Sequence, residues 1–536
     1  MYSQSLLYYY YNINYMTIKK ILFGSVLAVG MVGTANAQYT EDVLLFSQGD
    51  NGGTARFKAM GGASTALGGD ISSITGNPAG LGFYNQSDAS ATFRFQNNKN
   101  KSNYFGNKSD SKTDNFNIDN GGIVFHMPTT KYGGDLTRGW LNFNVGIAYN
   151  RTNLFNNKLD YQGINSDNSI THAYADQMFD QNGSEWANDL NSSLMFDKTT
   201  GKDKNFYFPL AEGRDNEQLN SVWTKGGKSE TALSFGSNYS NKFYIGATFS
   251  LTDFRYEKSA VFTEYGMTKT AKGIEALNPD SKYLKPGSTE SEFVDVDYEL
   301  FDHYGQVTQG SGFDFKLGMI YKATPSLSLG FTAKTPTFMS ITDESTAYTD
   351  INYFKPEAGT SFHDYGSKYY DSSYDYNLQT PYKLSAGVTQ YFGAGLLTAE
   401  VEFVDYASMR WRDVNNYNKA DEKQMNANIK DTYQAAFNVR VGGEVLFDQV
   451  FSGRAGFNYN GNPYKSADYK TYGISAGLGA KLGRGLYLDL TGVYQANNYK
   501  ESPYLITYEG DWNTVSPSVD IKNSRTNVML TIGSKF

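Results

Sequence analysis

In the stretch Leu141-Asn142-Phe143-Asn144-Val145-Gly146-Ile147-Ala148-Tyr149-Asn150, every odd position is apolar and every even position is small or polar. Successive side chains of a β-strand point to opposite faces, so such a strand has one apolar and one polar face. The same alternation runs from Phe313 to Tyr321 and from Ile474 to Leu482. It predicts an all-β protein.

Segments of this kind number about fourteen, and single-chain bacterial barrels have an even number of strands. Tight turns such as 240–241, 324–325 and 483–484 alternate with long polar stretches such as 151–229, 257–309, 343–380 and 407–431. Short periplasmic turns and long outer loops are typical of transmembrane barrels. A soluble β-sandwich also alternates, but the regular loop lengths favour a transmembrane antiparallel β-barrel. The expected strands are 88–98, 119–127, 138–150, 230–238, 242–256, 310–323, 326–342, 381–391, 394–406, 432–446, 450–461, 470–482, 485–498 and 524–536.

The composition excludes several classes of protein. Only 19% of residues are charged, 15% are aromatic, and the net charge is −8. An acidic chain has no basic footprint for nucleic acid. There is no cysteine, which excludes disulfides, thiolate metal sites and a lipid-modified N-terminal cysteine, and there are only four histidines. We therefore expect no cofactor and no metal.

The N-terminus predicts export. Lys19 and Lys20 precede an apolar run over 21–32, and Ala35-Asn36-Ala37 has the small residues that signal peptidase requires. Residues 1–37 are thus a predicted signal peptide, with Met16 the expected true start. The chain is expected in the outer membrane, in contact with its lipid and placed there by the barrel-assembly machinery. At the other end Val528, Leu530, Ile532 and Phe536 share one face, as a last strand that closes a barrel should.

Several motifs resemble one family. The segment 52–70 and Asn77-Pro78-Ala79-Gly80-Leu81 look like the N-terminal hatch of the FadL/TodX-type outer-membrane transporters. The resemblance continues through 318–331, Thr380-Pro381, 402–411 and 454–463. It implies a fourteen-stranded barrel over 88–536, an N-terminal plug over 38–87, and uptake of long-chain fatty acids or aromatic hydrocarbons.

Five residues are candidates for holding and gating the plug: Asn77, Pro78, Ala79, Arg56 and Asp70. Asn77-Pro78 alone is only a turn signal, because Asn closes turns readily and Pro fixes φ. Between a Gly- and Ala-rich segment and the first strand, however, the triplet would direct the plug into the wall. We expect Arg56 and Asp70 to pair with inward charges such as Arg94 or Glu402.

If the apolar faces meet lipid, the charges of the strands point into the lumen. An Arg or Lys on the lipid face near the midplane would cost about 2–4 kcal/mol. These groups could cross-link a filled interior or line a substrate path, and both interpretations stay open. The expected lumen-facing charges are Arg94, Asp314, Lys316, Glu402, Arg440 and Arg454.

The predicted function is a passive channel for hydrophobic small molecules, and we do not expect an enzyme. The expected ligands are fatty acids or related lipids, and the expected oligomeric state is a monomer. One alternative is a structural or adhesive barrel. Another is an outer-membrane hydrolase that uses Asp302-His303 near Asp295, Asp297 and Glu299, because general acid–base catalysis needs such groups within hydrogen-bond reach. The simpler interpretation of this acidic stretch is a solvated loop.

Overall fold

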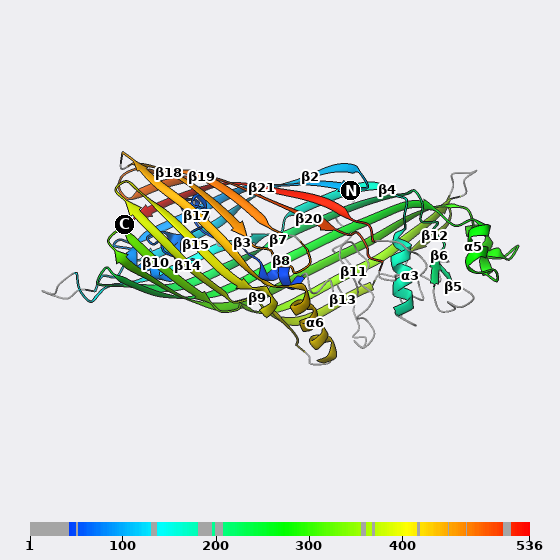
Figure 1. The fold of residues 1–536 in the computed structure, drawn as a ribbon, viewed down its shortest axis with the longest axis horizontal. Helices are drawn as coiled ribbons and strands as arrows, with labels where there is room; N and C mark the ends of the chain where they lie inside the picture. The colour runs from blue at the N-terminus through cyan, green and yellow to red at the C-terminus, as the bar shows by residue number, and fades with distance from the viewer. Residues whose placement is uncertain are drawn as a thin grey trace, which may run out of the picture.

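The computed structural model is a closed antiparallel barrel of fourteen strands with the N-terminal segment inside it (Figure 1). The structure describes residues 42–49, 52–129, 137–180, 196–198, 207–354, 361–366, 370–414, 419–448, 450–467, 469–506 and 516–536. The predicted signal peptide, residues 1–37, lies outside these ranges. Among the described helices none is long and apolar enough to cross a membrane.

Ten wall positions are single strands: β1 Asp88–Tyr104, β2 Asn107–Phe125, β7 Asn216–Tyr239, β8 Phe243–Met267, β9 Asp297–Thr324, β17 Ala435–Phe447, β18 Phe451–Asn460, β19 Thr471–Lys481, β20 Leu486–Glu501 and β21 Val519–Lys535. The other four are interrupted strands: β3 Trp140–Leu154 with β4 Asn157–Asn165, β10 Leu327–Lys334 with β11 Phe338–Phe354, β14 Lys383–Phe392 with β13 Tyr370–Gln379, and β15 Gly395–Asp405 with β16 Arg410–Asp413.

The remaining elements lie in the lumen or on the connections. They are α2 Ala55–Ala59, η3 Ile71–Ile74, η4 Pro78–Phe83, α3 Ile170–Asp180, β5 Phe196–Lys198, β6 Tyr207–Pro209, α5 Ala271–Leu277, η5 Lys282–Leu284, η6 Thr289–Phe293, β12 Ser361–Gly366, η7 Tyr406–Ser408 and α6 Lys419–Thr432.

The barrel closes where its first and last strands meet. β1 pairs with β21 from Asp88↔Lys535 to Tyr104↔Val519. Ser87 and Phe536 extend this ladder, since each backbone N–H donates to the other's carbonyl oxygen, at 3.1 and 2.9 Å. The last residue therefore completes the closure, and no edge is left unpaired in lipid at this junction.

A belt of exposed apolar side chains surrounds the barrel. On β9, Phe313, Phe315, Leu317, Met319 and Tyr321 are 40–64% exposed, whereas the inward Asp314 between them is fully buried. Similar outward residues lie on every side of the barrel, for example Phe143, Leu251, Leu397 and Leu478. A soluble sandwich would bury such residues. The belt is therefore the lipid-facing surface of a transmembrane barrel.

The strands on one side extend far above this belt, and here the predicted limits were wrong. Stretches 257–267, 297–309 and 343–354, expected as loops, continue β8, β9 and β11. Above the belt the apolar residues change face, so that on β9 Tyr298, Leu300 and Tyr304 point inward and are buried. They join Phe208, Phe262, Tyr353 and Tyr504 in a separate core, here called the outer cap. The reversed alternation explains why these segments did not look like membrane strands.

The two ends of the barrel differ. The short turns lie at one end, where Ser240, Asn241 and Arg484 have positive φ and Gly483 and Gly485 supply the flexibility that such turns require. At the other end the rim is uneven, because β7 and β9 have 24 and 28 residues while β18 and β19 have 10 and 11. Figure 1 shows α3, α5, β5 and β6 at this end of the barrel.

Candidate functional site: the hatch, the wall seam and the lumen chamber

Residues 52–84, here called the hatch, cross the lumen as three short helices. Each helix is capped by the residue before it: Thr54 Oγ1 accepts from Phe57 N, Asp70 from Ser72 N and Asn77 from Ala79 N. Side-chain oxygens at this position satisfy N–H groups that a helix start leaves free. α2 lies against β18–β21, and η4 lies against β3 and β7–β9 on the opposite side. The hatch thus spans the bore.

Glycines on the inner wall let the hatch backbone approach the strands directly. A methyl group at Gly442 would lie 2.6 Å from Met60 Cβ, and one at Gly330 would lie 2.7 Å from Ala66 Cα. Both distances are too short for any larger residue without displacing the hatch. The inner-wall glycines in contact with the hatch are Gly122, Gly146, Gly236, Gly246, Gly318, Gly330, Gly387, Gly442, Gly456 and Gly477.

The triplet Asn77-Pro78-Ala79 is buried against β8 and β9. Asn77 Nδ2 donates to Thr65 O at 2.5 Å and to Met319 O at 3.2 Å, which joins the hatch both to itself and to the wall. Pro78 begins η4, where a missing N–H costs nothing. Ala79 packs against Tyr244 and Ile320. The triplet is therefore an anchored helix start, and more than a solvent-exposed turn.

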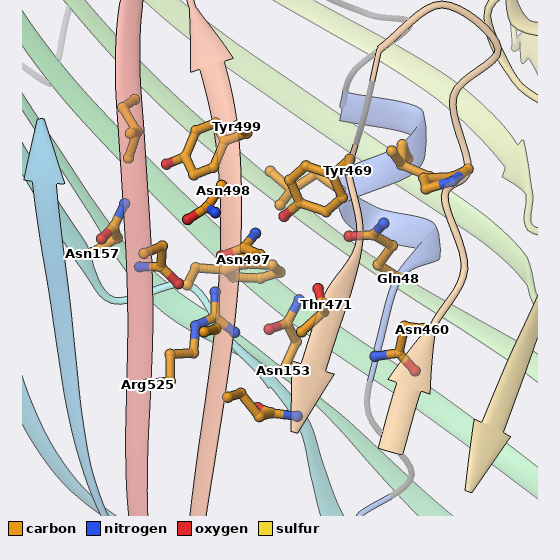
Figure 2. A pocket seen from close by; sticks show the side chains of 18 of the residues that line it. Gln48, Asn153, Asn157, Asn460, Tyr469, Thr471, Asn497, Asn498, Tyr499 and Arg525 are labelled. Atoms are coloured by element: carbon orange, nitrogen blue, oxygen red, sulfur yellow. The ribbon is translucent and has the colours of Figure 1, made fainter. Parts of the chain in front are cut away.

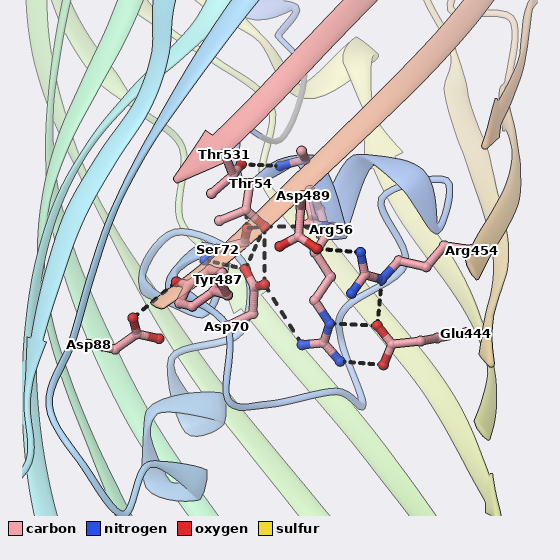
Figure 3. A network of polar contacts seen from close by, with 12 residues as sticks. Thr54, Arg56, Asp70, Ser72, Asp88, Glu444, Arg454, Tyr487, Asp489 and Thr531 are labelled. Atoms are coloured by element: carbon pink, nitrogen blue, oxygen red, sulfur yellow. Dashed lines mark hydrogen bonds and ion pairs between the residues drawn. The ribbon is translucent and has the colours of Figure 1, made fainter. Parts of the chain in front are cut away.

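The second candidate group, Arg56 and Asp70, belongs to a network of ion pairs (Figure 3). Arg56 Nε and Nη2 donate to the two oxygens of Glu444 at 2.8 and 2.9 Å, and Arg56 Nη1 lies 3.8 Å from Asp70. Arg454 binds Glu444 and Asp489, both at 2.5 Å. The expected partners were wrong, because Arg56 pairs with Glu444 on β17 rather than with Glu402. Sequence gives no cross-strand register from which to choose between two inward glutamates.

A second anchor lies on β15. Glu400 Oε2 accepts hydrogen bonds from Ser64 N at 2.9 Å and Thr65 N at 3.0 Å, and its Oε1 binds Arg440 at 2.6 Å. Arg440 also binds Glu402 at 2.9 Å, and Glu402 accepts from Asn438. Glu400 thus joins the hatch backbone to the wall charges. Hydrogen bonds to an ionised acceptor are about twice as strong as neutral ones.

Lysines hold the N-terminal segment on the opposite side. Lys316 donates to Thr75 O in the hatch, and Lys228 donates at 2.6 Å to Phe46 O in the helical stretch 42–47 that precedes the hatch. Lys334 pairs with Asp314 at 3.0 Å and with Glu230 at 3.3 Å. All six expected lumen-facing charges point inward: Arg94, Asp314, Lys316, Glu402, Arg440 and Arg454.

The wall separates between β2 and β3. The backbone ladder between these strands runs only from Asn120↔Asn150 to Phe125↔Val145, and the rest of β2, up to Asn107, has a backbone ladder with β1 alone among the described strands. After Leu154 the chain bends inward at Phe155, which packs against Phe46 and Tyr256. β4 then lies against β2, and side chains join the two: Asp160 N donates to Ser111 Oγ at 2.8 Å, and Asn156 Nδ2 donates to Asn115 Oδ1. On the unpaired part of β2, Phe116 and Ile118 are 72% and 53% exposed. This break in the backbone ladder, here called the seam, therefore lies within the apolar belt.

A β-bulge marks the lower end of the seam. Asp119 has no partner in the β1–β2 register, which passes from Thr92↔Asn120 to Phe93↔Ile118. Bulges re-aim side chains, and here Asp119 points inward and pairs with Arg94 Nη2 at 2.7 Å. Arg94 is thus paired with Asp119, and not with the hatch as the sequence suggested. Asp119 is a residue of the site that sequence reasoning missed, because a bulge breaks the alternation.

Above the hatch and beside the seam lies a chamber of about 1400 Å³ (Figure 2). Its wall is amide- and tyrosine-rich, and its lining includes Asn153, Asn157, Asn497, Tyr469 and Tyr499. Apolar side chains contribute one part of the lining, among them Leu44, Leu45, Phe155, Leu159 and Val222. The chamber therefore offers both polar and apolar contacts to a ligand.

Asp302 and His303 do not form an acid–base pair. Adjacent residues of β9 point to opposite faces, so Asp302 is buried in the outer cap beside Thr349 while His303 stacks outside on Tyr348 at 4.2 Å. Burial raises the pKa of the Asp302 carboxyl well above its usual value. The interpretation as a solvated acidic loop was wrong for Asp302, which lies in a strand with an apolar inner face.

No family model matches the sequence, and no curated protein matches it. The structure is similar to the Pseudomonas putida toluene transporter TodX, at 13% identity and a TM-score of 0.48, covering 91% of this chain and 99% of that one. It is similar to a Pseudomonas aeruginosa FadL homologue (13%, 0.47, 90% and 98%) and to the Ralstonia pickettii toluene transporter TbuX (14%, 0.46, 91% and 99%). The likeness concerns the fold alone.

Proposed function

We propose that the chain is an outer-membrane channel of the FadL/TodX type for hydrophobic compounds, with long-chain fatty acids or related lipids as its ligands. The observation that carries the proposal is a plugged bore combined with a seam in the wall at the height of the lipid. A plugged bore does not favour free flow of hydrated solutes. A seam within the apolar belt offers an apolar ligand a way out that avoids water.

The energetics favour such a lateral route. Apolar surface prefers a dry environment by about 25 cal/mol per Å², so a ligand in the chamber gains by moving its apolar part past Phe116 and Ile118 into the membrane. The ligand binds in the chamber, the hatch shifts, and the ligand is released, and no covalent bond is made or broken. The many anchors of the hatch hold it, while its tight contacts with wall glycines leave little room for partial opening.

The experiment measures uptake of radiolabelled hexadecanoate and toluene by a bacterial host that lacks its own channel for such compounds. We expect this chain to restore uptake of at least one of them. Replacing Asn77-Pro78-Ala79 with Gly-Gly-Gly should leave the barrel assembled and change uptake or small-solute leakage. The matched control is the same replacement at Thr324-Pro325-Ser326, a turn outside the lumen. Uptake no greater than that of the empty host would refute the channel and leave the structural or adhesive barrel.

A further inference from the structure

Four polar side chains form a patch on the inner wall where β1, β21 and β20 run side by side. Gln96 on β1 is level with Asn527 on β21, and Arg525 on β21 is level with Gln495 on β20. All four line the chamber. Gln96 is also two positions along β1 from Arg94, at the lower end of the seam. We call these four residues the Arg525 patch.

The patch contains polar atoms without a partner. Among the described residues Arg525 has no carboxylate within ion-pair distance, and its buried Nε has no hydrogen-bond acceptor there. Gln96 Nε2 and Asn527 Oδ1 also lack a partner in the described part of the chain, and their residues are only 3% and 6% exposed. Arg440 and Arg454, by contrast, each bind two carboxylates. Burying polar groups without partners is costly, so this patch differs in kind from the cross-linked charges around the hatch.

We propose that the Arg525 patch binds the anionic, oxygen-bearing head group, a carboxylate or a phosphate, of an amphiphilic ligand. A guanidinium presents parallel N–H donors that fit such groups, and Gln96 Nε2 adds a donor beside it. This proposal rests on the proposed function and specifies the ligand of that channel. A bare hydrocarbon would leave these donors unpaired, and sites built for hydrogen bonds reject analogues that lack the bonding group.

The height of the patch fits an amphiphile. On β21 the outward residues Val528, Leu530 and Ile532 belong to the apolar belt, and Thr526 follows above them. Arg525 therefore lies just above the outer edge of the belt, level with the head groups of the surrounding lipid. The seam lies on the far side of β1 and β2 from Arg525, so a ligand with its head at Arg525 reaches the membrane by laying its tail across the inner face of these two strands.

The experiment uses the purified full chain in nonionic detergent micelles and measures competition with radiolabelled hexadecanoate. The competing probes are hexadecyl phosphate, hexadecanol and hexadecane. We expect the parent protein to bind an anionic probe at least tenfold tighter than hexadecanol. Arg525→Gln should weaken anion binding about 10- to 100-fold and leave hexadecanol unchanged. The order of hexadecanoate and hexadecyl phosphate identifies which anion the patch prefers.

The matched control is Lys112→Gln, which removes an exposed cation on β2 that does not line the chamber. Unchanged anion binding in Arg525→Gln would overturn the proposal, as would an equal loss in Lys112→Gln or an equal loss for hexadecanol. If Arg525→Gln does not assemble, Gln96→Leu is judged by the same outcomes. Selective binding in vitro without uptake in cells would refute the channel and keep the patch; uptake without selectivity would refute the patch alone.

Discussion

Replacing Glu400 with Gln tests whether the hatch is held to the wall by charge. The substitution keeps the shape of the side chain and removes the negative charge that receives Ser64 N and Thr65 N. A hydrogen bond to a charged group contributes about 1.5–3 kcal/mol and a neutral one about 0.5–1.5 kcal/mol. The loss is then about 1–1.5 kcal/mol per bond, or about 2–3 kcal/mol for the two bonds.

Because an equilibrium constant changes tenfold for each 1.4 kcal/mol, the loss of about 2–3 kcal/mol should make amide exchange at Ser64 and Thr65 about 30- to 150-fold faster. The assay is hydrogen–deuterium exchange of the purified protein, read on peptides that cover 61–67. Glu402→Gln is the matched control, because Glu402 also binds Arg440 but receives no hydrogen bond from a hatch amide within the described residues. Equal acceleration in both variants, or no acceleration in Glu400→Gln, would refute the reasoning.

Gly442→Val should force Met60 and its neighbours away from the wall, destabilise the folded protein by about 1–3 kcal/mol and increase small-solute leakage in conductance recordings. Gly492→Val is the control and should not increase leakage, because a Cβ at position 492 would meet no atom within 4 Å. A disulfide can be introduced between residues 49 and 152. A Cβ at position 49 would lie 3.6 Å from the Cβ of Thr152, a separation that suits a disulfide. Because the chain has no cysteine, the double variant Gly49→Cys with Thr152→Cys can form only this one disulfide. Oxidation should stop uptake and reduction should restore it; unchanged uptake of the oxidised form would show that residues 42–49 need not leave β3. The raised pKa of Asp302 means that its neutral form stabilises the outer cap at low pH and that this contribution is lost as pH rises through the raised value. Asp302→Asn should therefore slow exchange in the cap at neutral pH and reduce its pH dependence, and faster exchange would contradict this.

The sequence predicted the membrane part of the fold well, because there the two faces differ strongly in polarity. The first wall strand, β1, begins at Asp88, and the tight turns at 240–241 and 483–484 lie where the alternation stops. The outer halves of β8, β9 and β11 were missed because their apolar residues point inward to the cap.

The site was predicted less completely. Which charges point inward can be predicted from the alternation along each strand alone. The partner of each charge depends on the register between distant strands, which no single sequence pattern specifies. Arg56 was therefore recognised while Glu444 was not assigned to it. Asp119 was hidden by its bulge. The inner-wall glycines such as Gly330 and Gly456 were visible as small residues on the polar face, and their repeated presence at mid-strand was the signal that a plug touches the wall there.

The closure at Ser87 and Phe536 has a consequence for the order of assembly. The hatch precedes every wall strand in the chain, yet its anchors lie on strands up to β21, where Thr531 Oγ1 accepts from Ala55 N at 2.7 Å. Thr531 lies on the strand that also closes the barrel against β1. The hatch therefore completes its contacts only once β21 has joined the wall. In the closed barrel it can leave only lengthwise or through the seam.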